Sequence, residues 1–200
     1  MSTSTKKKWW RSSKSRTAIF SFGAALFIIL LGFTSVYVER SLKKRAELAT
    51  PTGIPVKLLI PSIGVKAIIE KVGVDSQGRM GLPSNFTDVG WYTYGPHPGE
   101  KGSAVIAGHL DTATDANAVF GNLANLKKGD DVYVIDDLKQ IIHFKMLSTE
   151  TYDEAEAPLE KIFNQRGGTA RLNLVTCDGV WNQETRNYSE RRVVYLERAP

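Results

Sequence analysis

Hydrophobic and polar residues follow two different patterns along this 200-residue chain. Residues 18–38, "AIFSFGAALFIILLGFTSVYV", form one uncharged run, whereas the chain beyond residue 54 contains only short apolar stretches. A helix rises about 1.5 Å per residue, so this run is long enough to cross the roughly 30 Å hydrocarbon core of a bilayer. The pattern predicts one transmembrane helix followed by one folded domain.

The folded part, residues 54–200, reads mainly as β-strands. β-branched and aromatic runs recur at short intervals, and turn signals such as "SQGRMG" and "KKGD" separate them. Seven or eight strands at this spacing predict an all-β closed barrel or sandwich. The predicted strands are Val56–Ile60, Val65–Val72, Ser103–Gly108, Asp131–Asp136, Gln140–Leu147, Arg171–Cys177 and Arg191–Glu197.

Helical periodicity is sparse in this domain. Residues 117–126 and 156–163 place apolar side chains three or four positions apart, which predicts one to three helical turns over the barrel openings. Neither segment is long enough to define the fold.

The charges on both sides of the uncharged run predict its orientation. Residues 1–17 contain six basic residues and no acidic one, whereas basic and acidic residues mix after the run, so the N-terminus is expected in the cytoplasm. Residues 39–53 then form a stalk, and residues 54–200 lie outside the cell as a single-pass membrane protein. A cleaved signal peptide is the alternative, although "YVERSLKKR" offers no small-residue cleavage site.

The distribution of charge argues against a nucleic-acid partner. The formal net charge of +5 comes from residues 1–39, and the remainder of the chain is balanced. A basic tail before a membrane span is typical of membrane topology and not of a DNA-binding face.

The chain has one cysteine, Cys177, in "RLNLVTCDG". We expect it to end a strand, because "DG" favours a turn. One cysteine cannot close an internal disulfide, so the residue is a packed thiol, half of an intermolecular bridge, or a nucleophile. A nucleophilic thiol needs a base or cationic partner, because its free pKa is roughly 8.5.

Three histidines are candidate partners for this thiol. His109 follows an apolar strand in "AVIAGHLDT", the same setting as that of Cys177, whereas His97 lies in a proline-rich turn and His143 lies within a strand. His97 reads as a surface imidazole and His143 as a residue on a strand face. Only His109 has the position expected of a site residue.

Three motifs together resemble those of the sortases, the membrane-anchored cysteine transpeptidases of Gram-positive cell envelopes. They are "GSAVIAGHLDT", "LNLVTCDG" and an arginine about fourteen residues later in "SERRVVYLE". The resemblance covers about residues 54–197. The segments "VKLLIPSIGVKAIIEKVGVD" and "DVGWYTYGPHPGEKGSAVIAGHLDT" are most similar to class F sortases.

The resemblance implies an eight-stranded β-barrel that cleaves an LPxTG-type sorting signal on a secreted protein. Cys177 would form a thioester with the signal, His109 would protonate the leaving amine, and Arg191 would donate hydrogen bonds to the substrate or oxyanion. A peptidoglycan precursor or a pilin amine would then accept the acyl group. The resemblance implies no cofactor and no metal. A membrane-tethered cysteine hydrolase and a non-catalytic adhesion domain are the alternatives.

Several assignments within the site stay open in the sequence. Arg191 and Arg192 compete for the arginine position, and their place relative to "VVY" favours Arg191, because neighbouring strand residues face opposite sides. Asp111 either orients His109 or caps a loop, and Thr176 either shapes the pocket or packs. We expect substrate selection in the loop from Thr149 to Gly168.

Overall fold

The computed structural model describes residues 33–34, 36–42, 52–112, 114, 117–164 and 168–200. The chain divides into two compact units, Met1–Ala49 and Thr50–Pro200. In the first unit the described residues are helical. Within the described ranges, no helix combines the length and the apolar character that a membrane span needs. Most of the predicted span at residues 18–38 lies outside these ranges.

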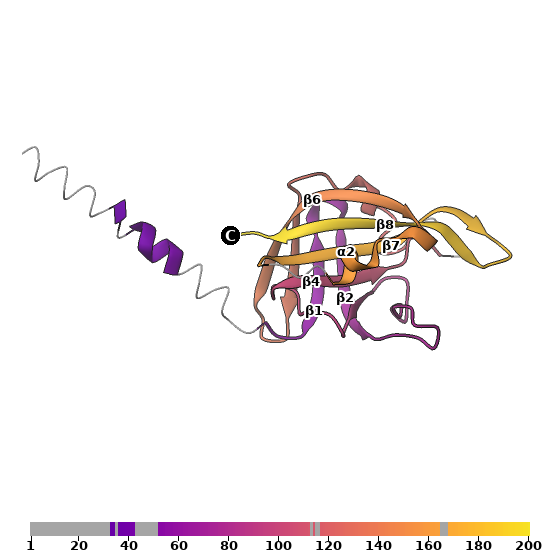
Figure 1. Ribbon diagram of the computed structural model, residues 1–200, viewed down its shortest axis with the longest axis horizontal. Coiled ribbons are helices and arrows are strands. Elements are labelled where there is room, and N and C mark those ends of the chain that lie inside the picture. Colours follow the sequence, from indigo (N-terminus) through magenta and orange to yellow (C-terminus); the bar gives the residue numbers. More distant parts are fainter. Residues whose placement is uncertain (1–32, 35, 43–51, 113, 115–116, 165–167) are drawn as a thin grey trace, which may run out of the picture. The chain divides into compact units, whose positions relative to one another are not determined.

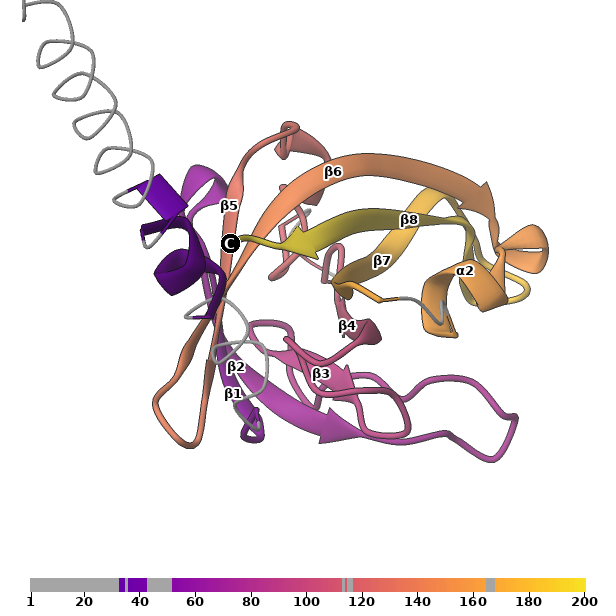
Figure 2. The same ribbon diagram turned by 60° about the vertical axis from the view of Figure 1, so that its left-hand side comes forward.

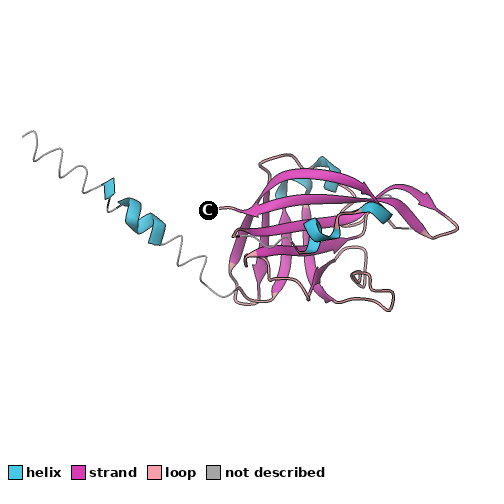
Figure 3. Cartoon of the chain, in the orientation of Figure 1, coloured by secondary structure: helices cyan, strands magenta, loops and turns pink. Residues whose placement is uncertain are grey.

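The second unit is a closed barrel of eight strands (Figures 1 and 3). The order around the barrel is β1-β2-β3-β4-β7-β8-β6-β5; the β2–β3 and β4–β7 pairs are parallel, and the others are antiparallel. The predicted all-β closed barrel is therefore confirmed. The strands are β1 (Pro55–Ile60), β2 (Val65–Val72), β3 (Val89–Tyr92), β4 (Gly102–Gly108), β5 (Asp131–Asp136), β6 (Ile141–Asp153), β7 (Ala170–Asn182) and β8 (Asn187–Arg198).

Alternating side chains fill the barrel interior. In β5 every second residue is buried, because successive side chains of a strand point to opposite faces. The residues of β7 and β8 that face the barrel interior are Leu172, Leu174, Val194 and Leu196, and all four are fully buried. Phe120, which follows β4 in the chain, is also fully buried in this core.

A second apolar cluster lies on the outer face of β4, β7 and β8. Its buried members are Val105, Ile162, Val193 and Tyr195. Ile162 belongs to the short helix α2 (Leu159–Phe163), which Figure 2 shows near β7 and β8. The buried amide of Asn173 donates a hydrogen bond to the Ile162 carbonyl at 2.6 Å and ties α2 to β7. β4 is therefore covered on both faces, which explains its continuous apolar sequence.

Some element boundaries differ from those predicted. β3 was not among the predicted strands, because it has four residues and one of them is Gly90. Residues 117–126 form only a short 3-10 turn at Leu123–Asn125, and of residues 156–163 only α2 is α-helical. β6 continues to Asp153, so the first part of the predicted Thr149–Gly168 loop is a strand.

β7 does not end at Cys177 as predicted. Its last pair with β4 is Ala107↔Val175, but its pairing with β8 continues to Asn182↔Asn187. The "DG" sequence forms a bulge in place of a turn, with Gly179 at φ 80°, a conformation that glycine adopts readily. β7 and β8 thus project beyond the barrel as a two-stranded hairpin (Figure 1).

Candidate active site

Cys177 lies opposite Arg191 where the β7–β8 hairpin leaves the barrel. The two residues are register partners in the antiparallel pair, and Thr176 pairs with Arg192. Val175 and Val193, two residues from Cys177 and Arg191 along their strands, pack in the outer cluster. Because side chains on one face recur every two residues, Cys177 and Arg191 share this outer face. Arg192 shares the inner face with Val194, as the sequence argument for Arg191 required.

His109 follows β4 directly, at the position beside Cys177. The parallel pairing of β4 and β7 reaches Ala107↔Val175, and the Thr176 hydroxyl donates to the Gly108 carbonyl at 2.8 Å. The next residues along the two strands are His109 and Cys177. The His109 ring packs against Phe86 with 4.8 Å between ring centroids. Thr176 is buried and fastens these two strand ends together.

The backbone around His109 is held from one side by a packed segment. The backbone N–H groups of Phe120 and Ala118 donate to the carbonyls of His109 and Leu110 at 2.9 and 3.1 Å. Gly108 permits this approach, since a Cβ there would lie 2.6 Å from the Phe120 ring. The core residue Phe120 therefore fixes where the chain leaves β4.

The guanidinium of Arg191 is fixed by four protein acceptors. Nη1 donates to the carbonyls of Tyr188 and Glu190 at 3.0 and 2.8 Å, and Nη2 donates to the Asn187 side chain at 2.7 Å. Nη2 also forms an ion pair with Glu154 at 3.4 Å. A guanidinium held in this way has a fixed direction, which suits recognition of carbonyl oxygens.

The environment of Cys177 favours the neutral thiol. Burial raises the pKa of Cys177, and the positive charge of Arg191 lowers it in part. The carboxylates of Asp111 and Glu154 act with burial and raise this pKa further. The thiol is partly buried and forms no disulfide.

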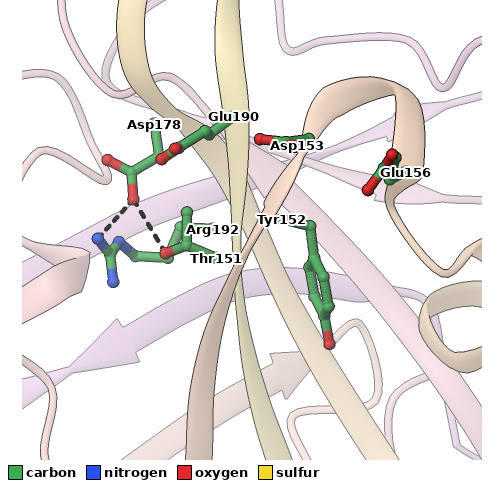
Figure 4. Close-up of a pocket in the computed structure, with 7 residues that line it drawn as sticks. All are labelled: Thr151, Tyr152, Asp153, Glu156, Asp178, Glu190 and Arg192. Atoms are coloured by element: carbon green, nitrogen blue, oxygen red, sulfur yellow. Dashed lines mark hydrogen bonds and ion pairs between the residues drawn. The ribbon is translucent and has the colours of Figure 1, made fainter.

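Arg192 has a different partner on the opposite face. It forms an ion pair with Asp178, whose carboxylate also accepts a hydrogen bond from the Thr151 hydroxyl at 3.2 Å (Figure 4). Carboxylates predominate in the open pocket around this pair. The pocket is lined by Thr151, Tyr152, Asp153, Glu156, Asp178, Glu190 and Arg192.

Asp111 makes a contact that the sequence did not suggest. Its carboxylate accepts a hydrogen bond from the Tyr188 hydroxyl, at the start of β8. Within the described residues, the structure records no hydrogen bond between Asp111 and His109. The contact that the structure shows for Asp111 therefore joins two distant segments of the chain, and the two roles considered for this residue stay predictions.

The other two histidines lie in separate environments. The Nδ1 atom of His97 lies 3.2 and 3.0 Å from the carbonyls of Thr52 and Gly53, so it is a partly buried donor and not a free surface imidazole. His143 bonds Asp131 at 2.6 Å and stacks on Tyr133. In the part of the chain that the structure describes, no group of three or more His, Cys, Asp or Glu residues could hold a metal ion.

Sequence reasoning missed three residues that surround the Cys177–Arg191 pair. Asn187 and Glu154 hold the guanidinium, and Tyr188 links β8 to Asp111. The signal for Asn187 and Tyr188 was proximity to the arginine doublet, but the strand was expected to begin at Arg191. Glu154 lies in the segment Thr149–Gly168, where the sequence predicted substrate selection but no contact with the arginine. Had the predicted strand begun at Asn187, as β8 does, Asn187 and Tyr188 would have been candidates for contacts with the site.

The barrel and the residues at its end define the class to which this protein belongs. The family model for the sortase domain matches residues 58–199. The chain therefore belongs to the sortase family of cysteine transpeptidases, as the three motifs predicted. Sortase A from Listeria monocytogenes is 36% identical over 78 residues, which span 39% of this chain and 32% of that protein. The match thus covers about one third of the length of this curated relative.

Solved structures of several sortase classes share the fold. Sortase C-1 from Actinomyces oris has 27% sequence identity and a TM-score of 0.55, covering 72% of this chain and 71% of the other. Sortase A from Listeria monocytogenes has 24% identity and a TM-score of 0.55 over 75% and 89% of the two chains. A sortase D5 transpeptidase from Clostridium perfringens has 21% identity and a TM-score of 0.54 over 80% and 89%. The similarity to class F stays a prediction.

Proposed function

We propose that this protein is a membrane-anchored transpeptidase that cleaves an LPxTG-type sorting signal and transfers the acyl group to an amine. The observation that carries the proposal is the convergence of Cys177 on β7, Arg191 on β8 and His109 directly after β4, where the β7–β8 hairpin leaves the barrel. Acyl transfer can use these three groups together. The thiol is the nucleophile, the imidazole transfers protons, and the guanidinium donates hydrogen bonds to the substrate's carbonyl oxygen.

The first half-reaction forms a thioester on Cys177. The thiolate attacks the carbonyl carbon of the signal's threonine, and the resulting tetrahedral intermediate expels the amine of the next residue. His109 donates a proton to that amine, so the peptide segment leaves as a neutral species. Because burial raises the pKa of Cys177, only a minor fraction of the enzyme carries the thiolate at neutral pH.

Arg191 stabilises the carbonyl oxygen that becomes negative in this step. Its contact with Glu154 is the longest of the four, at 3.4 Å, and Glu154 lies in the segment before α2. A substrate carbonyl would replace Glu154 as the acceptor, while the Tyr188 and Glu190 carbonyls keep the guanidinium in place. The donor is therefore largely fixed before the substrate arrives, which lowers the cost of reorganisation.

The second half-reaction passes the acyl group to an amine. The incoming amine attacks the thioester, His109 accepts its proton, and the thiolate of Cys177 leaves. The acceptor is a peptidoglycan precursor or a pilin amine. Attack by water would give hydrolysis only, which is the activity of the alternative cysteine hydrolase.

The outer apolar face beside Cys177 supports an extended peptide as the substrate. Val175 and Val193 lead from the cysteine and arginine toward α2, and Tyr92 and Phe163 pack against the same cluster. Apolar residues of a sorting signal would contact the partly buried residues at the margin of this cluster, Val175, Tyr92 and Phe163, with the segment from Glu154 to Phe163 as one wall. This assigns substrate selection to the predicted Thr149–Gly168 region.

Turnover of a labelled peptide tests the proposal. The full chain is incubated with a fluorescent LPxTG-type peptide, with and without an added amine. A transpeptidase gives the peptide–amine conjugate and a faster release of the C-terminal fragment in the presence of amine. Release of the C-terminal fragment at the same rate with and without amine would indicate a hydrolase. If the protein with intact Cys177 released no fragment, then the non-catalytic adhesion domain would be the remaining alternative.

A further inference from the structure

Tyr188 contacts the segments that carry two of the three proposed catalytic residues. Its hydroxyl donates to the carboxylate of Asp111, which lies two residues after His109. Its backbone carbonyl accepts a hydrogen bond from Nη1 of Arg191 at 3.0 Å. One residue at the start of β8 thus connects the chain that leaves β4 with the guanidinium on β8.

Tyr188 is itself held in a defined position. It is the register partner of Trp181 across the hairpin, and the two rings meet edge to face with centroids 5.2 Å apart. The hydrogen bond from Tyr188 to Asp111 raises the pKa of Tyr188 to about 12, with a further contribution from burial. The hydroxyl therefore stays protonated and can donate to Asp111 throughout the neutral pH range.

The segment that carries His109 is held from the barrel by the contacts described above. Residues 118 and 120 fix the carbonyls of Leu110 and His109 through backbone hydrogen bonds. The Tyr188–Asp111 hydrogen bond fixes the same segment from the hairpin. Loss of this bond would leave Asp111 free to move and would widen the range of positions that the His109 imidazole occupies.

From this geometry, and on the basis of the proposed function, we propose that the Tyr188–Asp111 hydrogen bond positions His109 for proton transfer. Tyr188 is a positioning residue, because it acts through Asp111 and does not touch the reacting atoms.

The test compares two leaving groups in the same peptide. An amide leaving group requires a proton from His109, whereas the alcohol of an ester analogue leaves more readily without one. We expect Tyr188→Phe to lower kcat/KM for the amide about tenfold, a fraction of the 10² to 10⁴ that a general acid contributes. For the ester, we expect kcat/KM to remain within about threefold of the parent value.

Variants of the partner distinguish this positioning role from a general loss of stability. Asp111→Ala should reproduce the defect, the double variant should be no worse than either single variant, and Asp111→Asn, which keeps an acceptor oxygen, should recover part of the loss. Tyr133→Phe on β5 is the control for removal of a tyrosine hydroxyl elsewhere in the barrel. Thermal unfolding of every variant is followed by circular dichroism.

Three results would overturn the proposal. They are an equal loss for amide and ester, additive effects of Tyr188→Phe and Asp111→Ala, and full activity of Tyr188→Phe on the amide. If the parent protein forms no acyl-enzyme with either peptide, then the proposed function fails. The result for Tyr188 can therefore be separated from the result for the enzyme class.

Discussion

The two faces of the β7–β8 hairpin carry neighbouring residues with different surroundings. On the outer face, Cys177 lies opposite Arg191, whose guanidinium is held mainly by neutral carbonyl and amide oxygens. On the inner face, Arg192 forms an ion pair with Asp178. Arg191 also contacts the Glu154 carboxylate, at 3.4 Å, whereas the ion pair of Arg192 with Asp178 is closer and neutralises more of the positive charge of Arg192. A one-residue alternation thus separates the proposed catalytic arginine from an arginine in an ion pair.

The largest effect that separates the two faces is expected from the arginine variants. Arg191→Lys should lower kcat/KM for the amide peptide by about 10²- to 10³-fold, because lysine cannot donate two hydrogen bonds at fixed angles. Arg192→Lys keeps the charge opposite Asp178 and should remain within about threefold of the parent. Steady-state cleavage of the fluorescent peptide measures both.

The arginine pair also has an internal control. Both variants keep the net charge of the chain, so a difference between them cannot come from long-range electrostatics. If Arg192→Lys lost more activity than Arg191→Lys, then the face assigned to the catalytic arginine would be wrong.

A smaller effect is expected where α2 is fastened to the outer face. Asn173→Ala removes the donor to the Ile162 carbonyl and should lower the free energy of unfolding by about 1–3 kcal/mol. KM for the peptide should rise, because α2 forms one wall of the proposed groove. Urea unfolding and peptide kinetics measure the two effects.

Ser103→Ala is the matched control for Asn173→Ala. Ser103 is also buried on a neighbouring strand, but its hydroxyl has no hydrogen-bond partner among the residues that the structure describes. Its removal should leave the free energy of unfolding unchanged or raise it. A parent-like stability of Asn173→Ala would show that α2 does not depend on this amide.

The smallest effect is expected from Glu154, which contacts the Arg191 guanidinium from the 3-10 turn between β6 and α2. Its negative charge raises the pKa of Cys177, so Glu154→Gln should lower the pH midpoint for alkylation of the thiol by iodoacetamide. The parent midpoint should lie above that of a free cysteine, because burial favours the protonated thiol. A midpoint that rises or stays constant in Glu154→Gln would contradict the assigned charge effect.

Seven of the eight barrel strands could be predicted because each has its own apolar pattern, which the four-residue β3 lacks. β2 and β5 have the predicted bounds, since turn signals flank regular runs of β-branched residues. The hairpin beyond Cys177 could not be predicted in this way. Its residues are polar or exposed and contribute little to a core. They are extended because β7 pairs with β8, and not because their side chains are buried.

The motifs of the proposed site could be recognised in the sequence, but the contacts that hold its residues in place could not. The alternation around "VVY" placed Arg191 on the face of Cys177, and the register of β7 and β8 agrees with that argument. Tyr188 and Asp111 are 77 positions apart in sequence, and no local pattern connects them. Their contact depends on how the chain after β4 meets the hairpin, which only the assembled barrel determines.

The most direct test of the central claim is the mass of the enzyme after brief exposure to the LPxTG-type peptide without amine. We predict an adduct equal to the acyl fragment, located by proteolysis on the segment that contains Cys177 and released by hydroxylamine, as expected of a thioester. Cys177→Ala should form no adduct and should retain the thermal unfolding temperature of a folded barrel. An adduct on any other residue, or peptide cleavage by Cys177→Ala, would contradict the assignment of Cys177 as the nucleophile.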